Sequence, residues 1–129
     1  MHYALFMDQY PVYTLELVKS DCNFTSVDDI ITALDQKLAT DPNASKIGIF
    51  DHFAHTHSIA DGEIAANILA AKLLIFCFGL KLPSPQAMAP RPRSFGVCEL
   101  PDRFVVTFMK APNPAMDAIM QRWVQELVE

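Results

Sequence analysis

The segment from Ile49 to His57, IFDHFAHTH, concentrates the side chains of this chain that could do chemistry. Three of the four histidines and the carboxylate of Asp51 fall within its last seven residues. Imidazole and carboxylate groups bind metal ions and transfer protons near neutral pH. The apolar start of the segment predicts a strand, whose side chains alternate between two faces. On that geometry Asp51 shares one face with His55 and His57, and His52 lies on the other.

Two chemical roles follow from that strand geometry. His55 and His57 could bind one metal ion together, with Asp51 or Glu63 as a third ligand. Two histidines alone make a weak site, because zinc takes three or four protein ligands. The alternative is a strand end whose histidines bond to backbone groups or face solvent. His52 could act as a general acid or base if it faces a pocket, and the alternative is a structural, hydrogen-bonded histidine.

Arg91 and Arg93 lie in a proline-rich segment, residues 83–94, which we expect to be a surface loop. A guanidinium group holds carboxylate or phosphate through paired hydrogen bonds, and a stiff loop lowers the cost of ordering it. The two arginines could therefore clamp an anionic ligand. The alternative for one of them is an ion pair with a structural carboxylate such as Glu99 or Asp51.

Composition narrows the class of protein. The 129 residues fit a single domain, 1–129, and 51% of them are hydrophobic, enough for a core without metal or disulfide. The net charge of −5 argues against nucleic acid as a partner. The low content of charged residues, 19%, weakly favours a homodimer with part of its surface hidden.

The spacing of the cysteines and the length of the apolar runs indicate the cellular compartment of the protein. The three cysteines are widely spaced, which argues against a disulfide framework and favours a reducing, cytoplasmic setting. Residues 1–8 lack the basic and apolar regions of a signal peptide. The longest apolar run, residues 68–80, is too short to span a membrane, so we expect no membrane association.

The elements that must position these residues can be predicted from periodicity and capping. We expect a first helix after Ser26 that ends near Thr40, and a last helix opened by Asn113 and Pro114. Residues 3–7 form either a short strand or a helical turn, 58–63 a loop, and 64–68 a helical turn. Strands are expected at residues 12–18, 46–53, 72–78, 94–100 and 104–109. The order β-α-β-β-β-β-α predicts an α+β fold, with two helices packed on one face of an antiparallel sheet.

That order is similar to the TATA-binding-protein-like fold. Within it, the run from Ile64 to Gly79 and the preceding Phe50-Asp51-His52 resemble an uncharacterised bacterial family, the domain of unknown function 302. The resemblance covers roughly residues 46–112 and is one of order and pattern. The chain departs from the family at Phe78-Gly79-Leu80, where the family continues with an Asn-Pro turn. The resemblance implies a fold and transfers no catalytic residues.

Three functions remain open from the sequence. The first is binding of a small anionic or aromatic ligand in a cleft between sheet and proline-rich loop, lined by Asp51, His52, His55, Arg91 and Arg93. The second is metal binding or metal-dependent catalysis at His55 and His57. The third is a homo-oligomeric structural or interaction protein. Neither the cofactor nor the reaction, if there is one, follows from the sequence.

Overall fold

A six-stranded antiparallel sheet forms the centre of the computed structural model, which describes residues 1–128. Its strands are β1 (His2–Phe6), β2 (Tyr10–Val18), β3 (Ala44–Asp51), β4 (Ala70–Phe78), β5 (Arg93–Glu99) and β6 (Arg103–Met109), in the spatial order β1-β2-β6-β5-β4-β3. The helices are α1 (Val27–Leu38), α2 (His52–Ser58) and α3 (Pro114–Gln125). Single 3-10 turns occupy Lys19–Asp21, Pro85–Met88 and Glu126–Val128.

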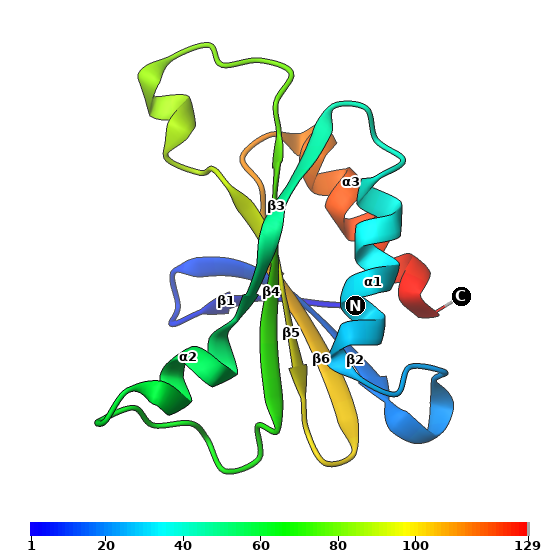
Figure 1. Ribbon diagram of the computed structural model, residues 1–129. Coiled ribbons are helices and arrows are strands. Elements are labelled where there is room, and N and C mark those ends of the chain that lie inside the picture. The colour runs from blue at the N-terminus through cyan, green and yellow to red at the C-terminus, as the bar shows by residue number, and fades with distance from the viewer. Residues whose placement is uncertain (129) are drawn as a thin grey trace.

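Helices α1 and α3 cover one face of the sheet, as the sequence predicts, and the core lies between the two layers (Figure 1). Each helix begins where a side chain accepts a hydrogen bond from a free backbone N–H. Ser26 accepts from the N–H of Asp29 at 3.1 Å, and Asn113 accepts from those of Ala115 and Met116. The apolar stripes of both helices then face the sheet.

The core consists of alternate residues on the four inner strands. Phe95, Val97, Phe104 and Val106 are fully buried in β5 and β6, together with Leu74 and Phe76 of β4. Trp123 of α3 packs across them and stacks on Phe78, with ring centroids 5.8 Å apart. The alternation expected of strands with one buried face is therefore present.

Three expectations about elements need correction or completion. Of residues 3–7, left open between strand and helical turn, residues 3–6 belong to the edge strand β1 and Met7 begins the turn that follows it. Residues 64–68 do not form the expected helical turn, since no helix is found there among the described residues. The expected strand over 46–53 ends at Asp51, because a helix begins at His52.

No helix within residues 1–128 has the length and apolar character needed to cross a membrane.

Candidate functional site

The histidine segment is helical, so the strand geometry expected for it is wrong. Asp51 ends β3 and its carboxylate accepts a hydrogen bond of 2.9 Å from the N–H of Ala54. That bond satisfies a free donor at the start of α2, which therefore turns the chain out of the sheet. His52, His55 and His57 follow on this short exposed helix.

On the helix the histidines separate differently than on a strand. His52 and His55 are three residues apart, and their ring centroids lie 5.8 Å from each other, both beside Phe50. The ring of His57 stacks instead on that of Phe53, with the two ring centroids 6.1 Å apart. No group of three or more His, Cys, Asp or Glu side chains able to hold a metal ion occurs within residues 1–128. A metal site at His55 and His57 stays a prediction, and the helix gives it no geometric support.

The arginines lie at the opposite end of the sheet from α2. In the register of the sheet Arg93 pairs with Phe76, near the end of β4, whereas Asp51 pairs with Lys72 near its start. Figure 1 shows α2 at one end of the strands and the segment between β4 and β5 at the other. The structure therefore does not bring His52 and His55 together with the two arginines.

A cavity does exist beside the arginines. The segment of residues 79–92, called the proline loop below, faces the N-terminus of α3 and encloses about 200 Å³. Most of its lining is apolar, and the polar groups come from Arg91, Arg93 and Asn113. The lining residues are Phe78, Pro83, Ala87, Pro90, Arg91, Arg93, Ala111, Pro112, Asn113 and Met116.

Arg93 is the polar group of this cavity with unused hydrogen-bonding capacity. The half-buried guanidinium donates to the carbonyl oxygens of Pro90 and Met109. Its buried Nε has no acceptor among the described residues. A buried donor without a partner costs roughly 1–3 kcal/mol. Burial lowers the pKa of Arg93, and the negative charge of Asp117 opposes that shift.

Arg91 differs from Arg93 in its hydrogen-bond partner. Its guanidinium donates a hydrogen bond of 2.8 Å to the carbonyl oxygen of Lys81, which ties the two ends of the proline loop together. The alternative expected from the sequence, an ion pair with Glu99 or Asp51, is not formed by either arginine. Glu99 pairs instead with Lys19, at 2.6 Å. Both arginines thus face the cavity without a carboxylate partner among residues 1–128.

Sequence reasoning missed a buried polar cluster next to the cavity. Asp117, the one buried charged residue of the described chain, accepts hydrogen bonds of 2.8 Å from Tyr13, Gln121 and the N–H of Ala111. These bonds fix the start of α3 to β2 and to the end of β6. An aspartate in the first turn of a helix is a common surface residue, so its type alone gave no signal.

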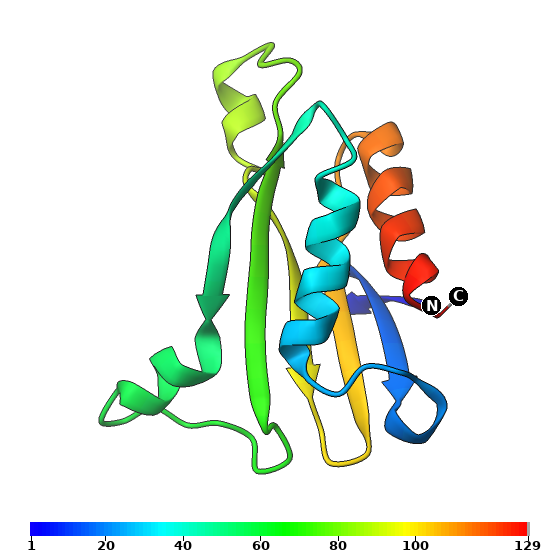
Figure 2. The ribbon, with the colours of Figure 1, turned by 45° about the vertical axis from the view of Figure 1, so that its right-hand side comes forward.

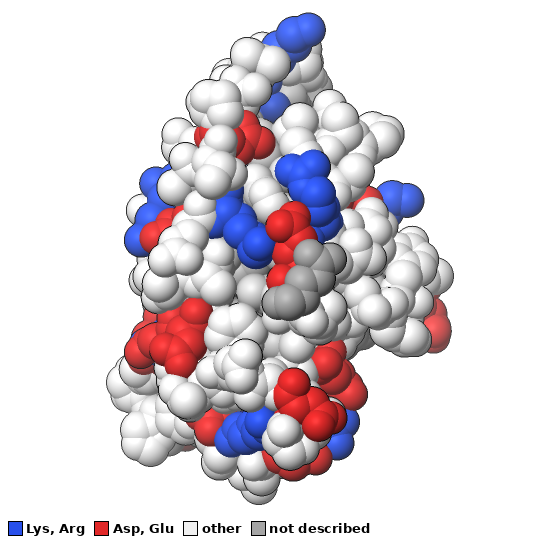
Figure 3. Space-filling view, turned by 90° about the vertical axis from the view of Figure 1, so that its right-hand side faces the viewer, with Lys and Arg blue, Asp and Glu red and all other residues white. Residues whose placement is uncertain are grey.

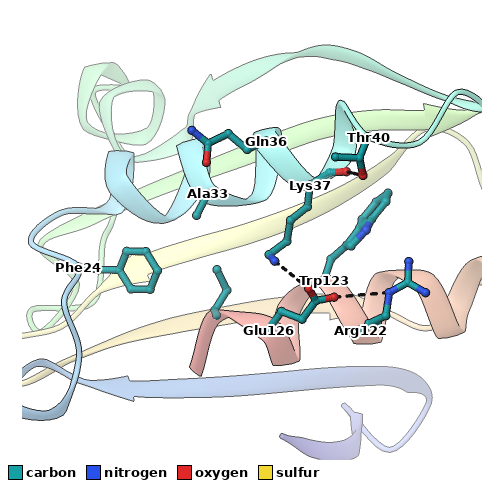
Figure 4. A pocket seen from close by; sticks show the side chains of 9 residues that line it. Phe24, Ala33, Gln36, Lys37, Thr40, Arg122, Trp123 and Glu126 are labelled. Carbon is teal, nitrogen blue, oxygen red and sulfur yellow. Dashed lines mark hydrogen bonds and ion pairs between the residues drawn. The ribbon is translucent and has the colours of Figure 1, made fainter. Parts of the chain in front are cut away.

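A larger hollow of about 580 Å³ lies between α1 and α3 (Figure 4). Its charged side chains are already paired: Lys37 lies 3.1 Å from one Glu126 oxygen, and Arg122 lies 3.5 Å from the other. Because Lys37, Arg122 and Glu126 are paired with one another, these side chains offer no unpaired charge toward a ligand. The cavity beside Arg93 is the better candidate site.

Comparison with known proteins places the chain in a family. A family model described as "Family of unknown function (DUF6858)" matches residues 1–129. The chain belongs to the DUF6858 family. No curated protein matches this DUF6858 chain.

Among solved structures, the DUF6858 fold is similar to the crystal structure of an uncharacterised conserved DUF302 protein from Bacillus stearothermophilus. The TM-score is 0.54 at 13% identity, over 91% of this chain and 94% of the other. The resemblance expected from the sequence is thus confirmed at the level of fold. At this identity it says nothing about the residues of the site, whose chemistry must be argued from this chain.

Proposed function

We propose that this DUF6858 protein binds a small carboxylate with an apolar, ring-sized body in the cavity between the proline loop and α3. The observation behind the proposal is the guanidinium of Arg93, half-buried at the wall of an apolar cavity and without a carboxylate partner among residues 1–128. A ligand carboxylate at this wall would supply the compensating negative charge.

The size and lining of the cavity define the rest of the ligand. A cavity of about 150 Å³ lined by apolar side chains holds one benzene ring, so the 200 Å³ found here suits one ring with a short acidic substituent. Phe78, Met116 and Ala87 provide apolar contacts for the ring. Because the proline loop contributes one wall, its prolines lower the cost of ordering the site on binding.

Binding can be followed through the single tryptophan of the chain. Trp123 stacks on Phe78, and Phe78 lines the cavity, so a bound ring should change the tryptophan emission. We expect benzoate to bind with a Kd on the order of 1 mM or below, as suits a ligand of this size. Benzamide, which has the same shape without the charge, should bind more weakly.

Two substitutions with a matched control locate the site. Ala87→Phe fills the cavity from the loop and should abolish benzoate binding without touching the core, while Trp123 stays the single tryptophan. Gln86→Phe places the same side chain on the neighbouring exposed residue, which does not line the cavity, and should leave binding intact. Arg91→Gln should weaken benzoate more than benzamide. Equal binding of benzoate to Ala87→Phe and to the unchanged protein would overturn the proposal.

Metal binding at His55 and His57, which the sequence also left open, has no comparable observation behind it among residues 1–128. Asp51, His52 and His55 stay predicted ligand-binding residues, now at a separate and exposed place on the molecule. A cytoplasmic location, expected from the cysteine pattern, also stays a prediction.

A further inference from the structure

The sheet has a second face that neither α1 nor α3 covers. The strand register places the side chains of alternate residues there, and the inner ones are apolar or small and only half-buried. These residues, called the open face below, are His2, Ala4, Val12, Thr14, Glu16, Val18, Ser45, Gly48, Phe50, Ala71, Leu73, Ile75, Cys77, Ser94, Gly96, Cys98, Arg103, Val105, Thr107 and Met109.

The open face carries almost no charge. Glu16 and Arg103, near one corner, are its charged side chains among the described residues, and they pair with each other at 2.9 Å. The lysines of β3 and β4 point to the helical side instead, where Lys46 pairs with Asp35 and Lys72 with Asp28. Figure 3 shows lysines, arginines and acidic residues interspersed over that helical side. A sheet with one solvated face normally alternates apolar and polar residues, so the open face does not have the composition of a solvated one.

Three segments stand around the open face. Figures 1 and 2 show α2 at one end of the strands and the proline loop at the other, and Figure 1 shows the β1–β2 turn on the side of the sheet away from α1 and α3. The position of α2 is fixed by Phe50, an open-face residue whose ring contacts His52 and His55. All three segments expose large apolar side chains: Phe6, Met7, Tyr10, Ile59, Leu80, Leu82 and Met88.

The extent of the open face matches what a stable dimer needs. Six strands spaced ~4.8 Å apart and about eight residues long at ~3.3 Å per residue give an area on the order of 700 Å². A stable protein–protein interface buries ~800 Å² per partner, so the face together with the segments around it reaches this size.

We propose that a second copy of this chain covers the open face, with the two sheets stacked face to face about a two-fold axis. A two-fold contact places the same surface of both copies against each other. That surface must therefore carry little net charge, because like charges would repel across the contact. The open face meets this condition, while the chain as a whole has a net charge of −5 and repels its copy elsewhere. Homodimer interfaces are more apolar than transient protein–protein interfaces, and Leu73, Ile75 and Val105 give the open face this apolar character.

Sedimentation equilibrium tests the proposal directly. We expect twice the chain mass of 14.4 kDa for the unchanged protein. Ile75→Arg and Thr107→Arg each place a guanidinium at the centre of the open face, where a monomer tolerates it in solvent. In the dimer that charge would be buried unpaired, and dimerisation should weaken by roughly a hundredfold or more.

Ala118→Arg provides the matched control, because Ala118 is exposed on α3 at the helical side. This variant should dimerise like the unchanged protein. A protein that stays monomeric at high concentration overturns the proposal, and so does a dimer that both open-face variants leave intact. Circular dichroism separates loss of dimerisation from loss of folding.

Alkylation of the unchanged protein gives a measurement without any variant. Cys77 and Cys98 lie on the open face, whereas Cys22 lies away from it and is also half-buried. We expect Cys77 and Cys98 to lose reactivity relative to Cys22 as the protein concentration rises. Reactivity ratios that do not change with concentration contradict the proposal. The cavity beside Arg93 opens on α3 and not on this face, so benzoate binding and dimerisation can fail independently.

Discussion

Tyr13 and Asp117 form the polar contact that joins α3 to the N-terminal part of the sheet. The Tyr13 hydroxyl donates to an Asp117 oxygen at 2.8 Å, and Gln121 donates to both side chains. Burial and the adjacent Asp117 carboxylate raise the pKa of Tyr13 from its ordinary value of 10.0 to about 12. Both effects disfavour the phenolate, because it would carry a second negative charge in a poorly solvated place.

This shift predicts a dependence of stability on pH. The neutral phenol is favoured in the folded state, so its contribution to stability is complete below pH 10 and is lost as the pH rises toward about 12. Tyr13→Phe should flatten the fall of the unfolding free energy in that interval. At neutral pH the same variant should cost roughly 0.5–1.5 kcal/mol, because a hydrogen bond is lost. Urea unfolding at several pH values measures both effects, and equal slopes for the two proteins would contradict the assignment.

At the residue scale the sequence indicated the arginines of the site but not their surroundings. Arg91 and Arg93 could be singled out because guanidinium groups on a proline-rich loop are chemically conspicuous. Asp117 and Met116 could not, because which residues of α3 meet the proline loop depends on packing between segments distant in the chain. The histidines were conspicuous as well, yet they lie at the other end of the sheet.

At the scale of elements, the turn between β1 and β2 has an unusual backbone. Met7 and Asp8 have φ angles of 55° and 59°, and the N–H of Gln9 donates to the carbonyl of Phe6 at 3.2 Å. This is the left-handed geometry of a type I′ hairpin turn, in which Asn and Gly are the favoured residues. A methionine there holds a conformation that side chains with a Cβ adopt at a cost.

The double substitution Met7→Asn with Asp8→Gly should therefore stabilise the protein. We expect a gain of about 1 kcal/mol in unfolding free energy, because both residues then accept the positive φ angles of the turn. Thermal or urea unfolding measures the gain. Asp8→Ala is the control: it keeps a Cβ in the left-handed region and should give no gain. A double variant no more stable than the control would argue against a type I′ turn.

Helices that begin after a clear N-cap residue and carry a long apolar stripe were predictable from the sequence, whereas the short helix α2 was not. Ser26 and Asn113 mark α1 and α3 in the sequence, and both helices have the expected spacing of apolar residues. In α2 the same kind of signal was present in Asp51, but the preceding Ile49 and Phe50 indicate a strand. Because α2 has only seven residues and none of them is buried, it has no periodicity to reveal it.

At the scale of the whole molecule, the proposed dimer links stability to concentration. Folding and association are then linked equilibria, because only the folded chain dimerises, and the melting temperature rises with protein concentration. We expect an increase of roughly 2–4 °C per tenfold concentration for an assembly of this size. Thr107→Arg should remove the dependence, while Ala118→Arg should retain it. Calorimetry at several concentrations checks this, and a constant melting temperature for the unchanged protein would contradict the linkage.

The strand order has a consequence for the sequence of events in folding. Strands β3 to β6 follow one another in space as they do along the chain, so each pair forms by closing a short segment. The contact between β2 and β6 instead joins residues such as Glu16 and Arg103, which are 87 positions apart. Closing so long a segment has a larger entropic cost and follows naturally once β6 is in place. The β1–β2 hairpin should thus dock late and open first, which native-state hydrogen exchange would detect in its backbone amides.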